Sequence, residues 1–483
     1  MPIYKVTDFL SEISAFFKNS DAHNAMYSIL DVIKWLKMSE KPLLGIKSRC
    51  NNVYSLLQVF QTLLLFPCFM VRNPYNYAGS SLSHLMDCKK DVFYRFMNNP
   101  CIDWRKLLYH LNLQLWSKIR VRSEHKSNNT CLIVDDTDYP KSGRRIENMG
   151  RVYSHVQNRC ILGFKALFLA ITDGKSQLLL DFAILGEKGK NGNFGMSANE
   201  LKRRFTKERN EEKPFKERIR EYSRKKTELM IEMIRRAIKR GIKFRYVLAD
   251  SWFANKDIIR FIHSRHIKCD YLGMIKVGTK GKTTYHFERK DFTAPALIKL
   301  LVKRGQKKYS RKLRCHYMTA DATFGGVPVR LFFVKRNKKG DWNALITTDT
   351  ALDFFEAYRL YSQRWALEVV FKESKGLLGL GKCQANNFAS QIAATSLTAL
   401  QYNILSVVKR FAAYETMGKL FEDVSKDSLE LSVTERIWGA LQEVVIAIAN
   451  LFGLTDEDIY DAIINRSEEI KHVFDIYKLK LAS

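Results

Sequence analysis

The sequence predicts an α/β protein in which a mixed β-sheet carries helices on its faces and lies between helical N-terminal and C-terminal regions. Three observations predict this class. Apolar residues repeat every three or four positions before residue 126, short apolar runs alternate with helical patterns from Cys131 onwards, and helical spacing returns after residue 349. The 483 residues provide enough chain for about two to four domains.

The N-terminal helices are expected at Met26–Leu36, Val53–Phe66 and Trp104–Trp116, where apolar residues have helical spacing. The stretch Val53–Val71 is uncharged over 19 residues, which is also long enough for a membrane span. Because this stretch contains Pro67 and several polar side chains and has no second span as a partner, we expect a buried helix.

Three strands are expected next, at Cys131–Asp136, Cys160–Thr172 and Leu178–Leu185. Each is a short apolar run of the length that strands usually have. The tight turn Asp173–Ser176 separates the last two, so these two strands should form a hairpin.

A basic segment, Lys202–Lys243, follows the hairpin and contains 17 Lys or Arg residues against 7 Asp or Glu residues. Its second half has the pattern of an amphipathic helix that ends at Gly241, and this helix is either a solvated face or a phosphate-contacting surface. A strand at Phe244–Asp250, a helix at Asn255–Ser264 and a strand at Cys269–Ile275 complete the mixed sheet.

Residues 276–348 contain β-segments joined by turns rich in Gly and Lys, which predicts an inserted β-subdomain. Helical patterns follow at 351–376, at 389–413 and from residue 433. The last of these carries an apolar stripe that either forms a dimer or closes the core: Trp438, Leu441, Val444, Val445 and Ile448. We therefore expect five regions: a helical N-terminal region at 1–125, the first part of the core at 126–275, the β-rich insertion at 276–348, the second part of the core at 349–415 and a helical C-terminal region at 416–483.

The composition indicates a polyanionic partner. Lys and Arg number 80 against 50 Asp and Glu, a net charge of +30, which favours nucleic acid over an anionic membrane surface. A hydrophobic content of 46% excludes wholesale disorder. Nine scattered cysteines without zinc-site spacing, and a start without the pattern of a secretory signal, predict a cytoplasmic protein.

Carboxylates follow two of the predicted strands. Asp135 and Asp136 end the first strand and Asp250 ends the fourth, although a turn before Pro140 and a helix cap would also explain them. If these strands are parallel neighbours, the carboxylates meet at one edge of the sheet and offer the oxygen ligands that Mg²⁺ prefers. Because side chains alternate along a strand, only one of Asp135 and Asp136 can face such a site.

A polar stripe follows the β-rich insertion. Four residues of the helix at 351–376 fall within about 60° of one face at about 100° per residue: Tyr361, Arg364, Glu368 and Lys375. The apolar residues Leu367, Val370 and Phe371 lie elsewhere on this helix and can pack on the sheet. An exposed helix face with an Arg364–Glu368 pair is the alternative.

These residues resemble the signature of bacterial cut-and-paste DDE transposases of the insertion sequence four family. That signature is Tyr-x2-Arg-x3-Glu-x6-Lys, and four residues match it without a gap: Tyr361, Arg364, Glu368 and Lys375. The family's first Asp precedes a Thr at the end of a strand, as Asp136 does, and its second Asp ends a later strand, as Asp250 does. The resemblance covers about residues 126–410.

The resemblance implies a ribonuclease H-like core in which Asp136, Asp250 and Glu368 hold two Mg²⁺ ions, with Mn²⁺ as a substitute. It implies that Arg364 and Lys375 contact DNA phosphates and that Tyr361 lies beside them. Trp342, near the end of the insertion, corresponds in position to a base-stacking Trp, although a Trp in a β-segment is also typical of a core.

The implied activity is strand cleavage and strand transfer at the terminal inverted repeats of an insertion element, either with or without a DNA hairpin as an intermediate. The implied partners are the element ends and target DNA, bound by a homodimer in the bacterial cytoplasm and nucleoid, with end-binding by residues 1–125 and no membrane. Two other functions fit part of the pattern. A ribonuclease H-like nuclease or resolvase needs only the carboxylates, and a non-catalytic DNA-binding protein needs only the charge.

Overall fold

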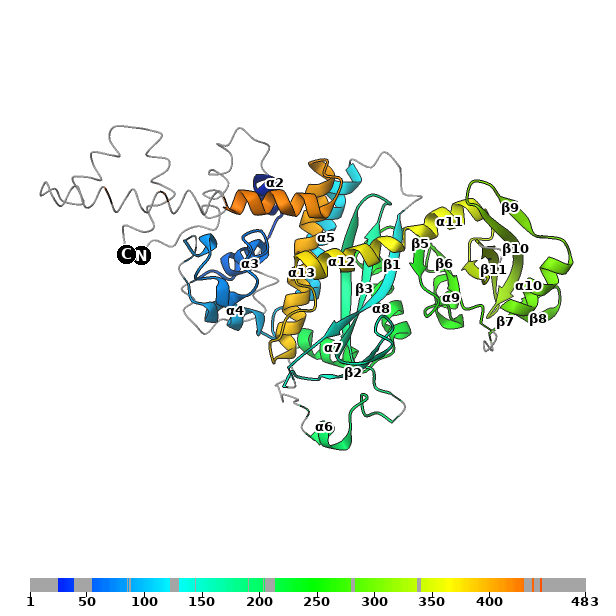
Figure 1. The fold of residues 1–483 in the computed structure, drawn as a ribbon, viewed down its shortest axis with the longest axis horizontal. Coiled ribbons are helices and arrows are strands. Elements are labelled where there is room, and N and C mark those ends of the chain that lie inside the picture. The colour runs from blue at the N-terminus through cyan, green and yellow to red at the C-terminus, as the bar shows by residue number, and fades with distance from the viewer. Residues whose placement is uncertain are drawn as a thin grey trace, which may run out of the picture. The chain divides into compact units, whose positions relative to one another are not determined.

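The computed structural model describes residues 25–38, 54–84, 86, 88–121, 130–143, 145–189, 191–202, 204, 213–278, 283–336, 340–429, 437 and 444 (Figure 1). The chain divides into two compact units. The first comprises Met1–Leu107, Gly376–Gly379 and Ala389–Ser483, and the second comprises Leu108–Lys375 and Leu380–Phe388. Of the predicted C-terminal apolar stripe, all but Val444 lies outside the described residues.

The first unit is helical in the part that the structure describes. Its elements are α2 (Ala25–Trp35), α3 (Leu56–Leu65), the short 3-10 helices η1 (Pro74–Asn76) and η2 (Ser81–His84), α4 (Lys90–Met97), most of α13 (Phe388–Phe411) and a helix over 417–429. The amide of Gln401 donates to the carbonyl of Leu63 at 2.9 Å, and the backbone N–H of Met26 donates to Asp427 at 2.8 Å. N-terminal and C-terminal helices therefore share one core.

Helix α3 lies in the uncharged stretch Val53–Val71, for which a buried helix and a membrane span were the alternatives. It has ten residues, begins at a capping box formed by Ser55 and Gln58, and buries most of its side chains. Among the described helices, none has the length and apolar content needed to cross a membrane.

The second unit is built on a mixed sheet. Its strands are β1 (Cys131–Pro140), β2 (Gly150–Ser154), β3 (Arg159–Thr172), β4 (Gln177–Leu185), β5 (Tyr246–Ala249), β6 (Asp270–Ile275), β7 (Thr284–Phe287), β8 (Lys290–Thr293), β9 (Lys308–Ser310), β10 (Cys315–Phe324), β11 (Val327–Lys335) and β12 (Asn343–Thr347). The order is β2-β3-β1-β5-β6-β12-β11-β10-β7-β8, with β4 paired to β3 and β9 paired to β10. Strand β1 is antiparallel to β3 and parallel to β5, which is parallel to β6.

The β-rich segment after residue 276 continues the same sheet, because β12 pairs with β6 in antiparallel register. Strand β2 is an addition to the strands that the sequence predicts. The helices of this unit are α5 (Trp104–Val121), α6 (Ala198–Lys202), α7 (Lys213–Tyr222), α8 (Lys226–Lys239), α9 (Lys256–Ile262), α10 (Ala294–Lys303), α11 (Phe354–Ser362) and α12 (Trp365–Leu377), of which α5 and α12 extend into the first unit.

Strand β1 is longer than predicted. The sequence places its end at Asp136, whereas β1 continues to Pro140 because β3 stays paired with it up to Gly163. At Gly163 the backbone has a φ of +145°, and a Cβ there would lie 2.1 Å from the carbonyl oxygen of Tyr139. Only glycine permits this close approach, which keeps the two strands together beyond the aspartates.

Helices cover both faces of the sheet beside β1. Asp135 is paired with Phe168 and Asp136 with Leu167, and directly paired residues share a face. Phe168 packs against Phe371 of α12 with ring centres 5.4 Å apart, so α12 covers the Asp135 face, and Figure 1 shows it crossing β1 and β3. Helix α8 contacts β3 and β4 and reaches the Asp136 face.

The single helix predicted at 351–376 is two helices, α11 and α12. Between them the backbone N–H groups of Gln363 and Arg364 donate to carbonyls three residues back, not four. This tighter winding ends α11 before α12 starts. Arg364 therefore lies in a turn, whereas Glu368 and Lys375 belong to α12.

Candidate functional site

Four carboxylates gather where the pairing between β1 and β5 ends, and we call them the carboxylate edge: Asp135, Asp136, Asp250 and Glu368. The condition for the carboxylates to meet is fulfilled, because these two strands are parallel neighbours with Val134 opposite Ala249. Asp135 follows Val134 within β1 and Asp250 follows Ala249, the last residue of β5, so the two aspartates lie at the same level along the strands.

Arg364 joins β1 to α12. Its Nη1 donates to Oδ2 of Asp135 at 2.7 Å, and its Nη2 donates to Oε1 of Glu368 at 2.5 Å. The side chains of Arg364 and Asp135 are each 14% exposed and that of Glu368 is 35% exposed, so solvent still reaches this group. The structure thus brings Asp135 and Glu368 together around one guanidinium group.

Asp136 lies on the other face of β1. Its Oδ2 accepts a hydrogen bond from Nζ of Lys226 at 3.0 Å and lies 3.6 Å from Nζ of Lys165. Lys165 is buried and forms a second ion pair with Asp138 at 2.5 Å. Asp136 is therefore neutralised by two lysines and is not brought to the face that carries Glu368.

Burial and neighbouring charges raise the pKa of two aspartates at this edge. Burial raises the pKa of Asp135 to about 7, with Arg364 opposing the shift and Asp136 and Asp250 adding to it. Burial also raises the pKa of Asp250, and the charge of Asp136 adds to that shift, whereas Arg364 and Lys226 oppose it. The charges of neighbouring aspartates thus add to the raised pKa of both Asp135 and Asp250, which shows that these carboxylates lie near one another.

The polar stripe faces the carboxylate edge. Nζ of Lys375 donates to Oγ1 of Thr137 on β1 at 2.6 Å, and the guanidinium carbon of Arg364 lies 5.8 Å from the ring centre of Tyr361. Both Tyr361 and Lys375 are half-buried, which does not fit a freely solvated helix face. Trp342 is half-buried in the segment before β12.

The donor set fits a hard divalent cation by its chemistry, because Asp135, Asp136, Asp250 and Glu368 offer the carboxylate oxygens that such cations prefer. Among the described residues, however, no three Asp, Glu, His or Cys side chains are arranged to hold a metal ion. The reason is visible in the ion pairs: Arg364 occupies the space between Asp135 and Glu368, and Lys226 covers Asp136.

Sequence reasoning missed Lys165 and Lys226. Lys165 is the single charged residue inside the apolar run of β3, and a lone charge in a buried strand is a signal that it has a partner. Lys226 is the first residue of α8, and no spacing in the sequence distinguishes it from its basic neighbours.

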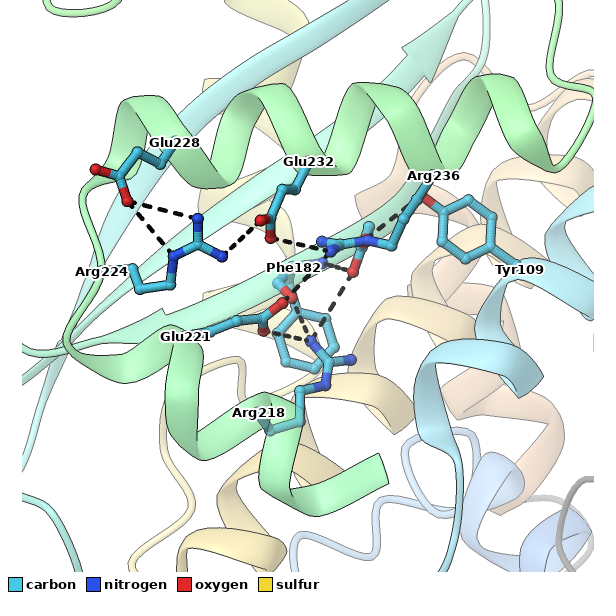
Figure 2. Close-up of polar contacts among 9 residues, drawn as sticks. Tyr109, Phe182, Arg218, Glu221, Arg224, Glu228, Glu232 and Arg236 are labelled. Carbon is cyan, nitrogen blue, oxygen red and sulfur yellow. Dashed lines mark hydrogen bonds and ion pairs between the residues drawn. The ribbon is translucent and has the colours of Figure 1, made fainter. Parts of the chain in front are cut away.

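A second group of charged residues, the ion network, connects α7, α8 and β4 (Figure 2). It consists of Asp181, Glu221, Glu228, Glu232, Arg218, Arg224 and Arg236. Asp181 has no exposed surface, and Nε of Arg236 donates to it at 2.8 Å. Arg218 is also buried and donates to the carbonyl of Phe182. Acids and arginines alternate here, which is the pattern of a structural network.

Two family models match the chain. The DDE superfamily endonuclease model matches residues 80–270, and the transposase DDE domain model matches residues 214–404. No curated protein sequence matches significantly. A cryo-EM structure of the piggyBac transposase synaptic complex with hairpin DNA is similar, with a TM-score of 0.40 and 11% identity over 89% of this chain and 79% of that chain. The two family matches, which together include all four residues of the carboxylate edge, support a DDE transposase.

Proposed function

We propose that this protein is a DNA transposase of the insertion sequence four type. It would bind the terminal inverted repeats of its own element, cut them and join them to target DNA. The observation that carries the proposal is the position of the partly exposed carboxylate edge within the two DDE matches, with Asp135 and Asp136 in the first, Glu368 in the second and Asp250 in both. A net charge of +30 supports double-stranded DNA as the partner.

The proposed core is ribonuclease H-like. The strand succession β4-β3-β1-β5-β6, with antiparallel pairs up to β1 and parallel pairs after it, supports this fold. The proposed homodimer would hold two element ends in one synaptic complex, acting on nucleoid DNA in the bacterial cytoplasm.

Asp250 and Glu368 are the proposed metal ligands, together with one aspartate of β1. Two Mg²⁺ ions, or Mn²⁺, would activate a water molecule or a 3′-hydroxyl and stabilise the leaving oxygen. For the ions to enter, the Arg364 side chain must leave the space between Asp135 and Glu368. Its charge would then be available to a DNA phosphate, which is also the role proposed for Lys375 beside Tyr361. Trp342 remains a proposed base contact.

Strand β1 offers two candidates for its metal ligand, Asp135 and Asp136. The family signature favours Asp136, which directly precedes Thr137. The shared face with Glu368 and the shared level with Asp250 support Asp135, and we therefore propose Asp135. Asp135→Asn should then lose cleavage whereas Asp136→Asn keeps a measurable part of it, and the reverse result would assign the ligand to Asp136.

The test of the function is a cleavage assay on DNA taken from the borders of the coding sequence. If the coding sequence lies between short inverted repeats flanked by target duplications, duplexes that carry those repeats are incubated with the protein and Mg²⁺. Cleavage at the repeat boundary is expected, and denaturing gels show whether a hairpin forms. Nicking that depends on DNA structure alone would indicate a resolvase, and binding without cleavage would indicate an inactive DNA-binding protein.

A further inference from the structure

An exposed tryptophan stands beside the carboxylate edge. Trp252 lies in the turn after β5, two residues beyond Asp250, and 52% of its surface is exposed. Its backbone N–H donates to Oδ1 of Asp250 at 2.9 Å. The main chain of Trp252 thus holds the carboxylate of Asp250, while the large ring is left open to solvent.

The ammonium groups of two lysines lie over the ring. Nζ of Lys276, which follows β6, lies 4.8 Å from the centre of the Trp252 ring, and Nζ of Lys226 lies 5.7 Å from it. Lys226 also donates to Asp136. Three segments distant in sequence therefore place one aromatic face and two ammonium groups next to two carboxylates of the edge.

The aromatic ring and the two ammonium groups together favour one chemical class of ligand. A flat aromatic surface in water binds another flat ring, and two ammonium groups beside it bind anions. A sugar would use the ring but not both cations, and an acidic peptide would use the cations but not the ring. A nucleotide strand supplies both a base and the phosphates on either side of it.

We propose that Trp252 stacks on a nucleobase next to the phosphodiester that is cut, with Lys276 at a neighbouring phosphate. The proposal deepens the proposed function and rests on it. A base in a duplex has no free face, so the base on Trp252 is one that has left the helical stack. Because every base has a π-face, the contact fixes the position of the strand without reading its sequence.

The experiment uses the full chain and duplexes with the element end, in which 2-aminopurine replaces single bases around the mapped cut. Stacking on an indole quenches this fluorophore, so wild-type protein should quench it at one position. Trp252→Ala should remove the quenching, and Trp252→Phe should keep part of it. Tyr309→Ala is the matched control, since Tyr309 on β9 is similarly exposed at 57% and should have no effect.

Affinity gives a second measure. Trp252→Ala should bind the element end about 5- to 150-fold more weakly, the equivalent of about 1–3 kcal/mol for one stacked base. The Asp250 hydrogen bond comes from the backbone and survives this change. Lys276→Ala should lower the log-log salt slope of binding by about 1, whereas Lys268→Ala, an exposed lysine before β6, should not.

The outcomes separate this inference from the proposed function. If Trp252→Ala binds, quenches and cleaves as the wild type does, while Glu368→Gln does not cleave, the inference is wrong and the function stands. If wild-type protein neither binds nor cuts element ends, the proposed function fails. Should the Trp252 variants fold poorly, photocrosslinking of wild-type protein to DNA with 5-iodouracil decides. A crosslink at Trp252 supports the inference, and crosslinks confined to other residues overturn it.

Discussion

The carboxylate edge and the ion network are both charged clusters beside the same strands, but they are built differently. In the ion network each buried acid lies between arginines, as Asp181 does between Arg218 and Arg236. In the carboxylate edge Arg364 and Lys226 also pair with acids, but burial and the charges of Asp136 and Asp250 outweigh Arg364 and raise the pKa of Asp135 to about 7. In the ion network the acids and arginines compensate one another. In the carboxylate edge the acids are available to a cationic ligand.

This difference distinguishes a structural role from a role in ligand binding or catalysis, which the number of charged residues in each cluster does not. A balanced, buried network contributes to stability mainly because removing one member leaves another unpaired. A cluster of mutually repelling carboxylates at the end of strands costs stability, and such sites are typical of ligand and catalytic function. Variants in the carboxylate edge should therefore lose cleavage and stay folded, whereas variants in the ion network should lose stability and keep cleavage.

The largest effect is expected for Glu368→Gln in the carboxylate edge. The substitution keeps the size of the side chain but removes a charged metal ligand, so the cleavage rate should fall by about a thousand-fold or more. Binding to the element end should persist, because phosphate contacts supply most of the affinity. Rates at saturating DNA measure the first effect and mobility shifts the second. Asp257→Asn, an exposed carboxylate on α9, is the control and should cleave normally.

Asp181→Ala in the ion network is expected to lose stability without losing cleavage. It removes the fully buried one of the two acids that Arg218 and Arg236 share, and because Glu221 still pairs with both, the free energy of unfolding should fall by at most about 3–5 kcal/mol. Urea denaturation measures this. Cleavage per folded molecule should be unchanged at low temperature. Glu228→Ala, at the exposed end of the network, should cost less than about 1 kcal/mol. Equal losses of stability from both variants would show that burial does not decide the contribution of Asp181, and a loss of cleavage per folded molecule in Asp181→Ala would refute the distinction between the two regions.

The sequence predicted the strands β1 and β5, because an apolar run followed by an acid is a strong local pattern in both, but it left their parallel pairing as a condition. It did not predict that β1 continues to Pro140, since that depends on Gly163 in a distant strand. Alternation along the strand separated Asp135 from Asp136. Which of them faces Glu368 depends on the side of the sheet on which α12 packs, and no local pattern encodes that choice.

The signature spacing around Glu368 was read from the sequence, but its geometry was not. A continuous helix would carry Arg364 on the same straight face, whereas the turn at Gln363 directs its guanidinium group to Asp135. Similarly, composition identified the basic segment but not that Lys226 pairs with Asp136. Long-range pairing decides such contacts, and residue spacing reports only local ones.

A third prediction uses the raised pKa of Asp135. The folded protein binds this proton more tightly than the unfolded chain, so stability falls as the pH rises from about 4 to about 7 and the carboxyl ionises. Asp135→Asn removes this loss. In EDTA, the variant should be more stable than the wild type at pH 8, by at most about 4 kcal/mol, with the difference shrinking toward pH 5. Urea midpoints at both values measure it. A difference independent of pH would show that Asp135 is fully paired, like the acids of the ion network.

The smallest effect is expected for Lys375→Ala, which tests whether the cations around the carboxylate edge serve the DNA or only the fold. Lys375 contacts Thr137, and burial lowers its pKa, so its ammonium group is held at the edge at some cost. Removing one phosphate contact should lower the log-log salt slope of end binding by about 1. At saturating DNA, cleavage and strand transfer should still be slower than in the wild type, because the group contacts the strand near the cut.

The control for this variant is Lys239→Ala, an exposed lysine at the end of α8. It can weaken binding by a similar salt-dependent amount, but at saturation it should cleave and join at the wild-type rate, because it lies outside the carboxylate edge. Comparison at saturation therefore removes the general effect of positive charge. If Lys375→Ala also reaches the wild-type rate at saturating DNA, the role of Lys375 is limited to its contact with Thr137 of β1. The signature would then retain a role in catalysis only through Glu368 and Arg364.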